Sequence, residues 1–76
     1  MHSKLHSITA RKLEKALLKD GFFVAHQRGS HKMFVKNNCV VILPMHHPSD
    51  SFRRKTLKNI LDQASWTEEY LIDLIK

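Results

Sequence analysis

The fold of this chain is decided by residues 22–43, which read FFVAHQRGSHKMFVKNNCVVIL. Aromatic and β-branched residues, which favour strands, dominate three runs in this stretch: residues 22–26, 33–35 and 39–43. A glycine turn at residues 28–30 separates the first two runs, and Asn37 with Asn38, which tolerate positive φ, separates the second and third. The segment therefore predicts three antiparallel strands joined by two tight turns.

The residues before this segment predict an amphipathic helix over residues 9–20. Ser7 or Thr9 can cap its start, and Gly21 can adopt the left-handed conformation that ends a helix. Three lysines share a second, solvent-facing side of this helix. The apolar positions at helical spacing are Leu13, Ala16 and Leu17, and the lysines are Lys12, Lys15 and Lys19.

The residues after the strands predict two more helices. An apolar stripe at helical spacing favours a helix from about Lys55, and Thr67 can cap a short last helix whose first turn holds Glu68 and Glu69. The stripe consists of Leu57, Ile60, Leu61 and Ala64. Helices packed on one face of a three-stranded antiparallel sheet form an α+β fold, so we predict this class. The residues expected in its core include Phe22, Phe23, Phe34 and Trp66, together with the thiol of Cys39.

The composition limits the chain to one small domain, over residues 1–76. No apolar run approaches the roughly 20 residues of a membrane-spanning helix. Residues 1–7 are expected to be a frayed N-terminus and have no signal-peptide pattern. A soluble cytoplasmic protein without a membrane partner is therefore expected. The formal net charge of +6 favours a polyanionic partner. Charge alone leaves nucleic acid and an acidic protein equally open.

The turn at residues 28–30 carries the most suggestive side chains. His31 follows it directly, and imidazole, with an unperturbed pKa of about 6.5, can take and give protons near neutral pH. Arg28 and Lys32 are the nearest cations in the sequence, and they would attract a phosphate to the histidine. Gly29 allows close backbone approach, and Ser30 can orient the imidazole. From residue type alone, a histidine hydrogen-bonded at a strand end is the better interpretation, since most histidines have no catalytic role. The basic neighbours and the glycine turn bring the two interpretations near parity.

Further candidates follow the third strand. The loop over residues 45–51 holds His46 and His47, which can contact an RNA backbone. The two histidines make a poor metal site, because adjacent histidines seldom bind one ion and Asp50 is the only nearby carboxylate. No metal or other cofactor is therefore expected. Cations gather at the predicted entry of the next helix, where they can hold phosphates. These cations are Arg53, Arg54 and Lys55.

The order of elements and several short motifs resemble the HicA family, small toxins of bacterial and archaeal toxin–antitoxin pairs. The motifs are Asp20-Gly21-Phe22, Gly29-Ser30-His31, Pro44 with His46-His47-Pro48, and Thr56-Leu57 with Ile60-Leu61. The resemblance covers residues 9–74. Lys32 departs from it, since many members have a second histidine there, and so do the short turn at residues 37–38 and the loop residues 49–51.

This resemblance implies a fold similar to the double-stranded RNA-binding domain and a metal-independent endoribonuclease that cleaves mRNA without the ribosome. It implies that His31 is the catalytic histidine, that Gly29 and Ser30 present it, and that a HicB antitoxin neutralises the chain. Two other functions remain open: a non-catalytic RNA-binding module of the same fold, and an interaction domain that docks an acidic protein. The Gly29-Ser30-His31 motif favours the first of these three functions.

Overall fold

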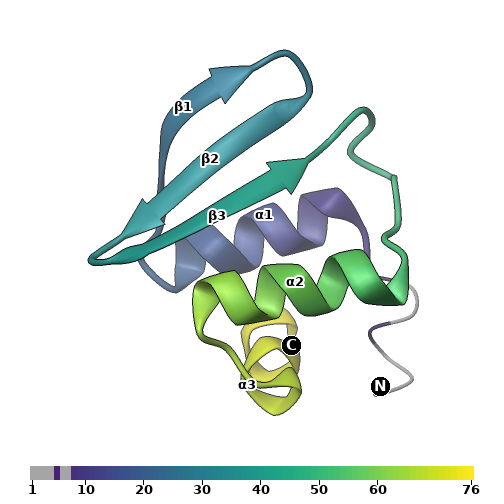
Figure 1. The fold of residues 1–76 in the computed structure, drawn as a ribbon. Helices are drawn as coiled ribbons and strands as arrows, with labels where there is room; N and C mark the ends of the chain where they lie inside the picture. The colour runs from purple at the N-terminus through teal and green to yellow at the C-terminus, as the bar shows by residue number, and fades with distance from the viewer. Residues whose placement is uncertain (1–4, 6–7) are drawn as a thin grey trace.

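The computed structural model describes Leu5 and residues 8–76, in which a three-stranded antiparallel sheet is packed against helices on one side (Figure 1). The α+β class predicted from the sequence is confirmed. The sheet has the order β1-β2-β3. In chain order the elements are α1 (Ala10–Lys19), β1 (Phe23–Arg28), β2 (His31–Lys36), β3 (Cys39–Pro44), α2 (Arg54–Ala64) and α3 (Glu68–Ile75).

Both predicted turns form, and both use a left-handed residue. Gly29 has φ +59° in the turn between β1 and β2, and Asn37 has φ +53° in the turn between β2 and β3. Glycine and asparagine are the residues that adopt this conformation at least cost. The short turns fix the register, so that Arg28 pairs with His31 across β1 and β2.

The side chains of β2 alternate between the two faces of the sheet. Phe34 is fully buried on the helix side, and its cross-strand partner Val41 shares that face. Lys32 and Lys36 lie two residues from Phe34 and therefore point the same way. The opposite surface is termed the open face, because α1, α2 and α3 lie on the other side of the sheet (Figure 1). The open face is formed by Phe23, His26 and Arg28 of β1, His31, Met33 and Val35 of β2, and Val40, Ile42 and Pro44 of β3.

The core lies between the sheet and the helices, and three expectations about it need correction. Phe23 points to the open face and is 57% exposed, whereas Phe22, Phe34 and Trp66 are buried as predicted. Cys39 is only partly buried at the edge of the core. Of the segment expected to fray, residues 1–4 and 6–7 lie outside the described residues, but Leu5 is packed into the core with 1% of its surface exposed.

The predicted helix caps form, and they set where the helices begin. The Oγ1 atom of Thr9 accepts a hydrogen bond from the Lys12 N–H (3.2 Å), and that of Thr67 accepts one from the Tyr70 N–H (3.1 Å). The alternative cap Ser7 lies outside the described residues. Gly21, with φ +101°, follows α1 as expected. No helix in the described part of the chain is both long and apolar enough to cross a membrane.

The loop between β3 and α2 is fastened to the start of α1. The first N–H groups of a helix have no partner inside it. Here the Ala10 N–H donates to the Asp50 carbonyl (2.7 Å), the Arg11 N–H donates to the Pro48 carbonyl (3.0 Å), and Thr9 forms an isolated bridge with Ser51. The loop that carries His46 and His47 therefore supplies the acceptors for the beginning of α1.

Candidate functional site

His31 stands at an exposed corner of the open face. It is the first residue of β2, and its cross-strand neighbours are Arg28 on β1 and Pro44 on β3. Directly opposite residues on neighbouring strands share a face at about 5 Å between Cβ atoms. The turn between them is held from the other side, because the Met45 N–H donates to the Ser30 carbonyl (2.6 Å). The corner thus joins an imidazole and a guanidinium, both open to solvent.

Lys32 lies on the other face of the sheet from His31, although the two are adjacent in sequence. Its Nζ atom is 2.6 Å from Oε2 of Glu14 on α1, and about a quarter of each side chain is exposed. The nearest cation in sequence is therefore not a spatial neighbour of the imidazole. Strand alternation explains this separation, because successive side chains point to opposite faces.

A surface hollow of about 580 Å³ lies beside this corner, between the β3–α2 loop and the start of α2. His46 and Arg53 both line it, and so does Pro44, which pairs with His31. Asp50 is the acidic group in its wall, and the Oδ2 atom of Asp50 accepts a hydrogen bond from the His47 N–H (2.9 Å). Pro44 is therefore the residue that the hollow, with His46 and Arg53, shares with the His31 corner.

The remaining candidates are exposed but do not line this hollow. His47 lies in the loop, and Arg54 and Lys55 occupy the first turn of α2. The lysines of α1 are likewise exposed at Lys12, Lys15 and Lys19. Among the residues that the structure describes, no three histidine, cysteine or acidic side chains gather closely enough to hold a metal ion.

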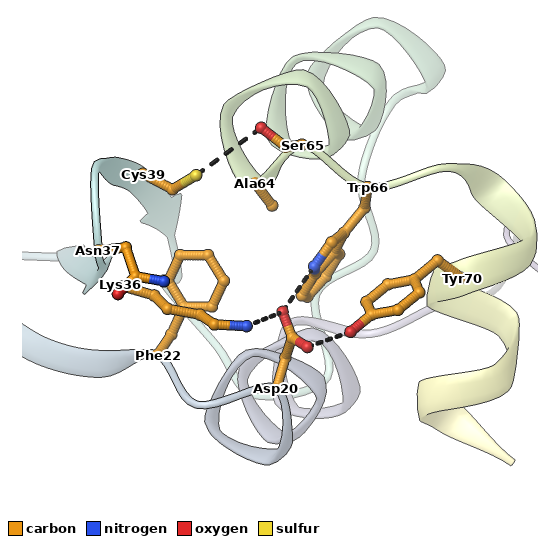
Figure 2. Close-up of a pocket in the computed structure, with 9 residues that line it drawn as sticks. All are labelled: Asp20, Phe22, Lys36, Asn37, Cys39, Ala64, Ser65, Trp66 and Tyr70. Carbon is orange, nitrogen blue, oxygen red and sulfur yellow. Dashed lines mark hydrogen bonds and ion pairs between the residues drawn. The ribbon is translucent and has the colours of Figure 1, made fainter.

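A second pocket, of about 230 Å³, lies at the opposite end of the sheet, and Figure 2 shows its polar centre, Asp20. The Oδ2 atom of Asp20 accepts a hydrogen bond from Nε1 of Trp66 (2.9 Å) and lies 3.2 Å from Nζ of Lys36. Its Oδ1 atom accepts a hydrogen bond from the hydroxyl of Tyr70. The Trp66 ring also meets the Phe22 ring edge-on, with centroids 6.0 Å apart. One carboxylate at the end of α1 thereby joins β2 through Lys36 and α3 through Tyr70, as well as Trp66 just before α3.

The protonation of this cluster follows from its contacts. Burial raises the pKa of the Asp20 carboxyl, but the hydrogen bonds from Tyr70 and Trp66 and the charge of Lys36 together bring that pKa below its usual value. The same hydrogen bond to Asp20 raises the pKa of the Tyr70 hydroxyl. Both shifts favour an ionised Asp20 and a protonated Tyr70 at neutral pH. Both carboxylate oxygens of Asp20 are engaged by side chains of the cluster itself, so the cluster suits a structural role.

Sequence reasoning did not find this cluster, because its partners are 46 and 50 residues apart in the chain. Asp20 was recognised only as part of a motif at the end of a helix. The signal present in the sequence is two aromatic residues with polar tips, Trp66 and Tyr70, four positions apart around the start of the last helix. Trp and Tyr usually find a hydrogen-bond partner when they are buried.

Comparison with models of known protein families shows to which family the chain belongs. The family model described as HicA toxin of bacterial toxin-antitoxin matches residues 10–66 of the 76-residue chain. This chain belongs to the HicA toxin family. The match extends from α1 through the whole sheet and α2 to Trp66, so it includes the His31 corner, the loop with His46 and His47, and Asp20. A comparison with curated proteins finds no match.

Membership of the HicA family identifies the chain as a toxin of a toxin–antitoxin system. HicA toxins are in general of the RNase type, with RNA as the kind of target and an antitoxin as partner. The observed order of a helix, three antiparallel strands and two helices agrees with the HicA fold, which is similar to the double-stranded RNA-binding domain.

Proposed function

We propose that this HicA toxin is an endoribonuclease that cleaves mRNA without a ribosome or a metal ion, with His31 as its catalytic group and a HicB antitoxin as its inhibitor. The observation that carries the proposal is the exposed His31 imidazole beside Arg28 at one corner of the sheet, in a chain of this family. An exposed corner is accessible to a polymer, which a deep pocket would exclude.

The chemistry needs a base for the 2′-hydroxyl proton and an acid for the departing 5′-oxygen. As the 2′-oxygen attacks the phosphorus, the bond from phosphorus to the 5′-oxygen breaks, and one proton is removed while another is supplied. His31 takes one of these roles, for which a positioned group contributes about 10²- to 10⁴-fold in rate. Arg28 stabilises the crowded phosphate, since a guanidinium can donate two parallel hydrogen bonds to its oxygens.

The other candidate residues take supporting roles. Gly29 and Ser30 set the turn that presents His31. Lys32, through its ion pair with Glu14, fixes β2 against α1 behind the imidazole and acts as a positioning residue. Flanking phosphates of the RNA are held by side chains at the hollow and along the first turn of α2. These are His46, His47, Arg53, Arg54 and Lys55.

The antitoxin inhibits by covering the His31 corner. An inhibitor of an exposed site has to occupy that surface or exclude RNA from it. We therefore expect HicB binding to bury the His31 and Arg28 side chains. A complex that leaves His31 open to RNA would contradict this steric account.

The deciding experiment is cleavage of a labelled single-stranded RNA in EDTA by the purified native chain and by His31→Ala. Asn38→Ala serves as the control, because Asn38 is an exposed residue of the turn at the other end of β2. We expect cleavage by the native chain and by Asn38→Ala but not by His31→Ala, with all three equally folded. Cleavage by His31→Ala would refute the assignment. Binding without cleavage by all three would favour a non-catalytic RNA-binding module.

A further inference from the structure

Phe23 is an aromatic side chain that the fold leaves in solvent. It begins β1, and 57% of its surface is exposed, although the adjacent Phe22 is buried. Its cross-strand neighbour is Val35, which in turn pairs with Val40, a residue 45% exposed. The end of the open face remote from His31 is thus a small apolar platform with an aromatic ring on it.

This platform shares its face with the His31 corner. His31 and Val35 are four residues apart on β2 and point to the same side, which places them roughly 13 Å apart at about 3.3 Å per residue. Arg28 is paired with His31 at one end of the face, and Phe23 is paired with Val35 at the other. A strand of RNA that lies along the open face can therefore reach both ends.

The charge of the sheet favours a polyanion over a neutral apolar partner. None of the three strands that the structure describes contains an aspartate or glutamate, and three basic side chains, His26, Arg28 and His31, stand on the open face itself. Sheet aromatics that stack on unpaired bases next to cationic groups are a common way for proteins to hold single-stranded RNA. Phe23 is an exposed aromatic ring on a strand, in a sheet whose strands contain no acidic residue, and it is therefore suited to stacking on an unpaired base.

We propose that Phe23 binds single-stranded RNA by stacking on a nucleobase away from the scissile phosphate, and so makes the open face a substrate-binding surface. The inference rests on the proposed function for its substrate, but it concerns binding and does not require that His31 cleave. The ring selects for an unpaired base, because a base within a duplex is stacked on its neighbours and has no free face.

The test measures binding of a labelled single-stranded oligonucleotide by fluorescence anisotropy, with every variant in a His31→Ala background so that no RNA is cut. Phe23→Ala and Phe23→Leu remove the ring, whereas Phe23→Trp keeps an aromatic surface. Leu18→Ala is the matched control, since Leu18 is 50% exposed on α1, away from the sheet. Thermal unfolding of each variant checks that the fold is unchanged.

We expect Phe23→Ala and Phe23→Leu to raise the Kd on the order of 5- to 150-fold, the effect of losing one stacked base, and Phe23→Trp and Leu18→Ala to change it less than about twofold. A series of oligonucleotides, each lacking the base at one position, then locates the contact. At one position, we expect the missing base to raise the Kd of the protein with Phe23 but not the Kd of Phe23→Ala. Such non-additivity identifies direct contact between the ring and that base.

Several results would overturn the inference: no RNA binding by any variant, an unchanged Kd for Phe23→Ala, or full binding by Phe23→Leu. If Phe23→Ala weakens the complex with the antitoxin but not with RNA, the platform is a protein interface instead. Failure of the catalytic proposal is separable from these outcomes. If the native chain cuts no RNA but RNA binding still depends on the Phe23 ring, the proposal of a nuclease is refuted and the proposal of base stacking by Phe23 is supported.

Discussion

Replacing Asp20 tests whether one carboxylate holds the helices and the sheet together. Asp20→Ala removes the acceptor of the Trp66 Nε1–H and the Tyr70 hydroxyl and the partner of Lys36. Hydrogen bonds to a charged group contribute about 1.5–3 kcal/mol, and a buried donor left without an acceptor adds a desolvation cost. Trp66 is 8% exposed and bears this cost, whereas the Tyr70 residue, 44% exposed, can turn to water.

The expected loss is therefore less than the sum of three bonds. Lys36 has 35% of its side chain exposed, so its ion pair adds little after solvent screening. We expect Asp20→Ala to lower the free energy of unfolding by about 2–4 kcal/mol, a large fraction of the roughly 4–11 kcal/mol typical for a domain of this size. The corresponding fall in Tm is on the order of 10–25 °C.

The assay is urea and thermal unfolding at pH 7 and at lower pH. Because the folded-state pKa of Asp20 lies below its unfolded value, its contribution is complete above about pH 4 and is lost as the pH falls through the folded-state pKa. The difference between the native chain and Asp20→Ala should therefore shrink on acidification. Asp73→Ala is the control, because the Asp73 side chain is 71% exposed and pairs with Lys76 on the surface. A loss below about 1 kcal/mol, or one independent of pH, would refute the reasoning.

Three further predictions concern the turn, a helix cap and the two cations nearest to His31 in the sequence. Gly29→Ala should cost about 1–2 kcal/mol of stability through its φ of +59° alone, since an added Cβ meets nothing within 4 Å; a loss much larger on thermal unfolding would point to a hidden contact. Thr67→Ala should cost about 0.5–2 kcal/mol through the lost cap of α3, and unchanged unfolding would contradict it. Arg28→Met should reduce the salt dependence of RNA binding by about 0.7 in log–log slope, whereas Lys32→Met, already paired with Glu14, should leave the slope unchanged; equal slopes for the two variants would reject this distinction.

The helices and strands could be predicted because each carries a periodic apolar pattern or a run of strand-favouring residues, and most also carry a local stop signal. The exception is instructive: the sequence analysis assigned both Phe22 and Phe23 to the core. Consecutive residues of a strand point to opposite faces, so two adjacent rings cannot both be buried by one sheet. Phe22 lies just before β1, and an irregularity between Val24 and His26 shifts the pairing of the strand, so the alternation alone could not say which ring faces the helices.

The arrangement of the candidate site could be predicted only in part from the sequence. A two-residue turn forces its flanking residues to pair, so the neighbourhood of Arg28 and His31 follows from local rules. The position of Lys32 also follows from alternation, but its partner Glu14 is 18 residues away and had no local signal. The hollow formed by His46 and Arg53 depends on how the β3–α2 loop folds back, which local patterns do not determine.

The bonds between the β3–α2 loop and α1 make two distant amides into reporters of loop motion. The Ala10 and Arg11 N–H groups donate to carbonyls of that loop and not to their own helix. Their exchange with deuterated solvent should follow the opening of the loop, while Leu13, whose N–H donates to the Thr9 carbonyl, follows fraying of the helix itself. A ligand that settles on the loop from the outside would then be visible as slowed exchange at two positions it never touches.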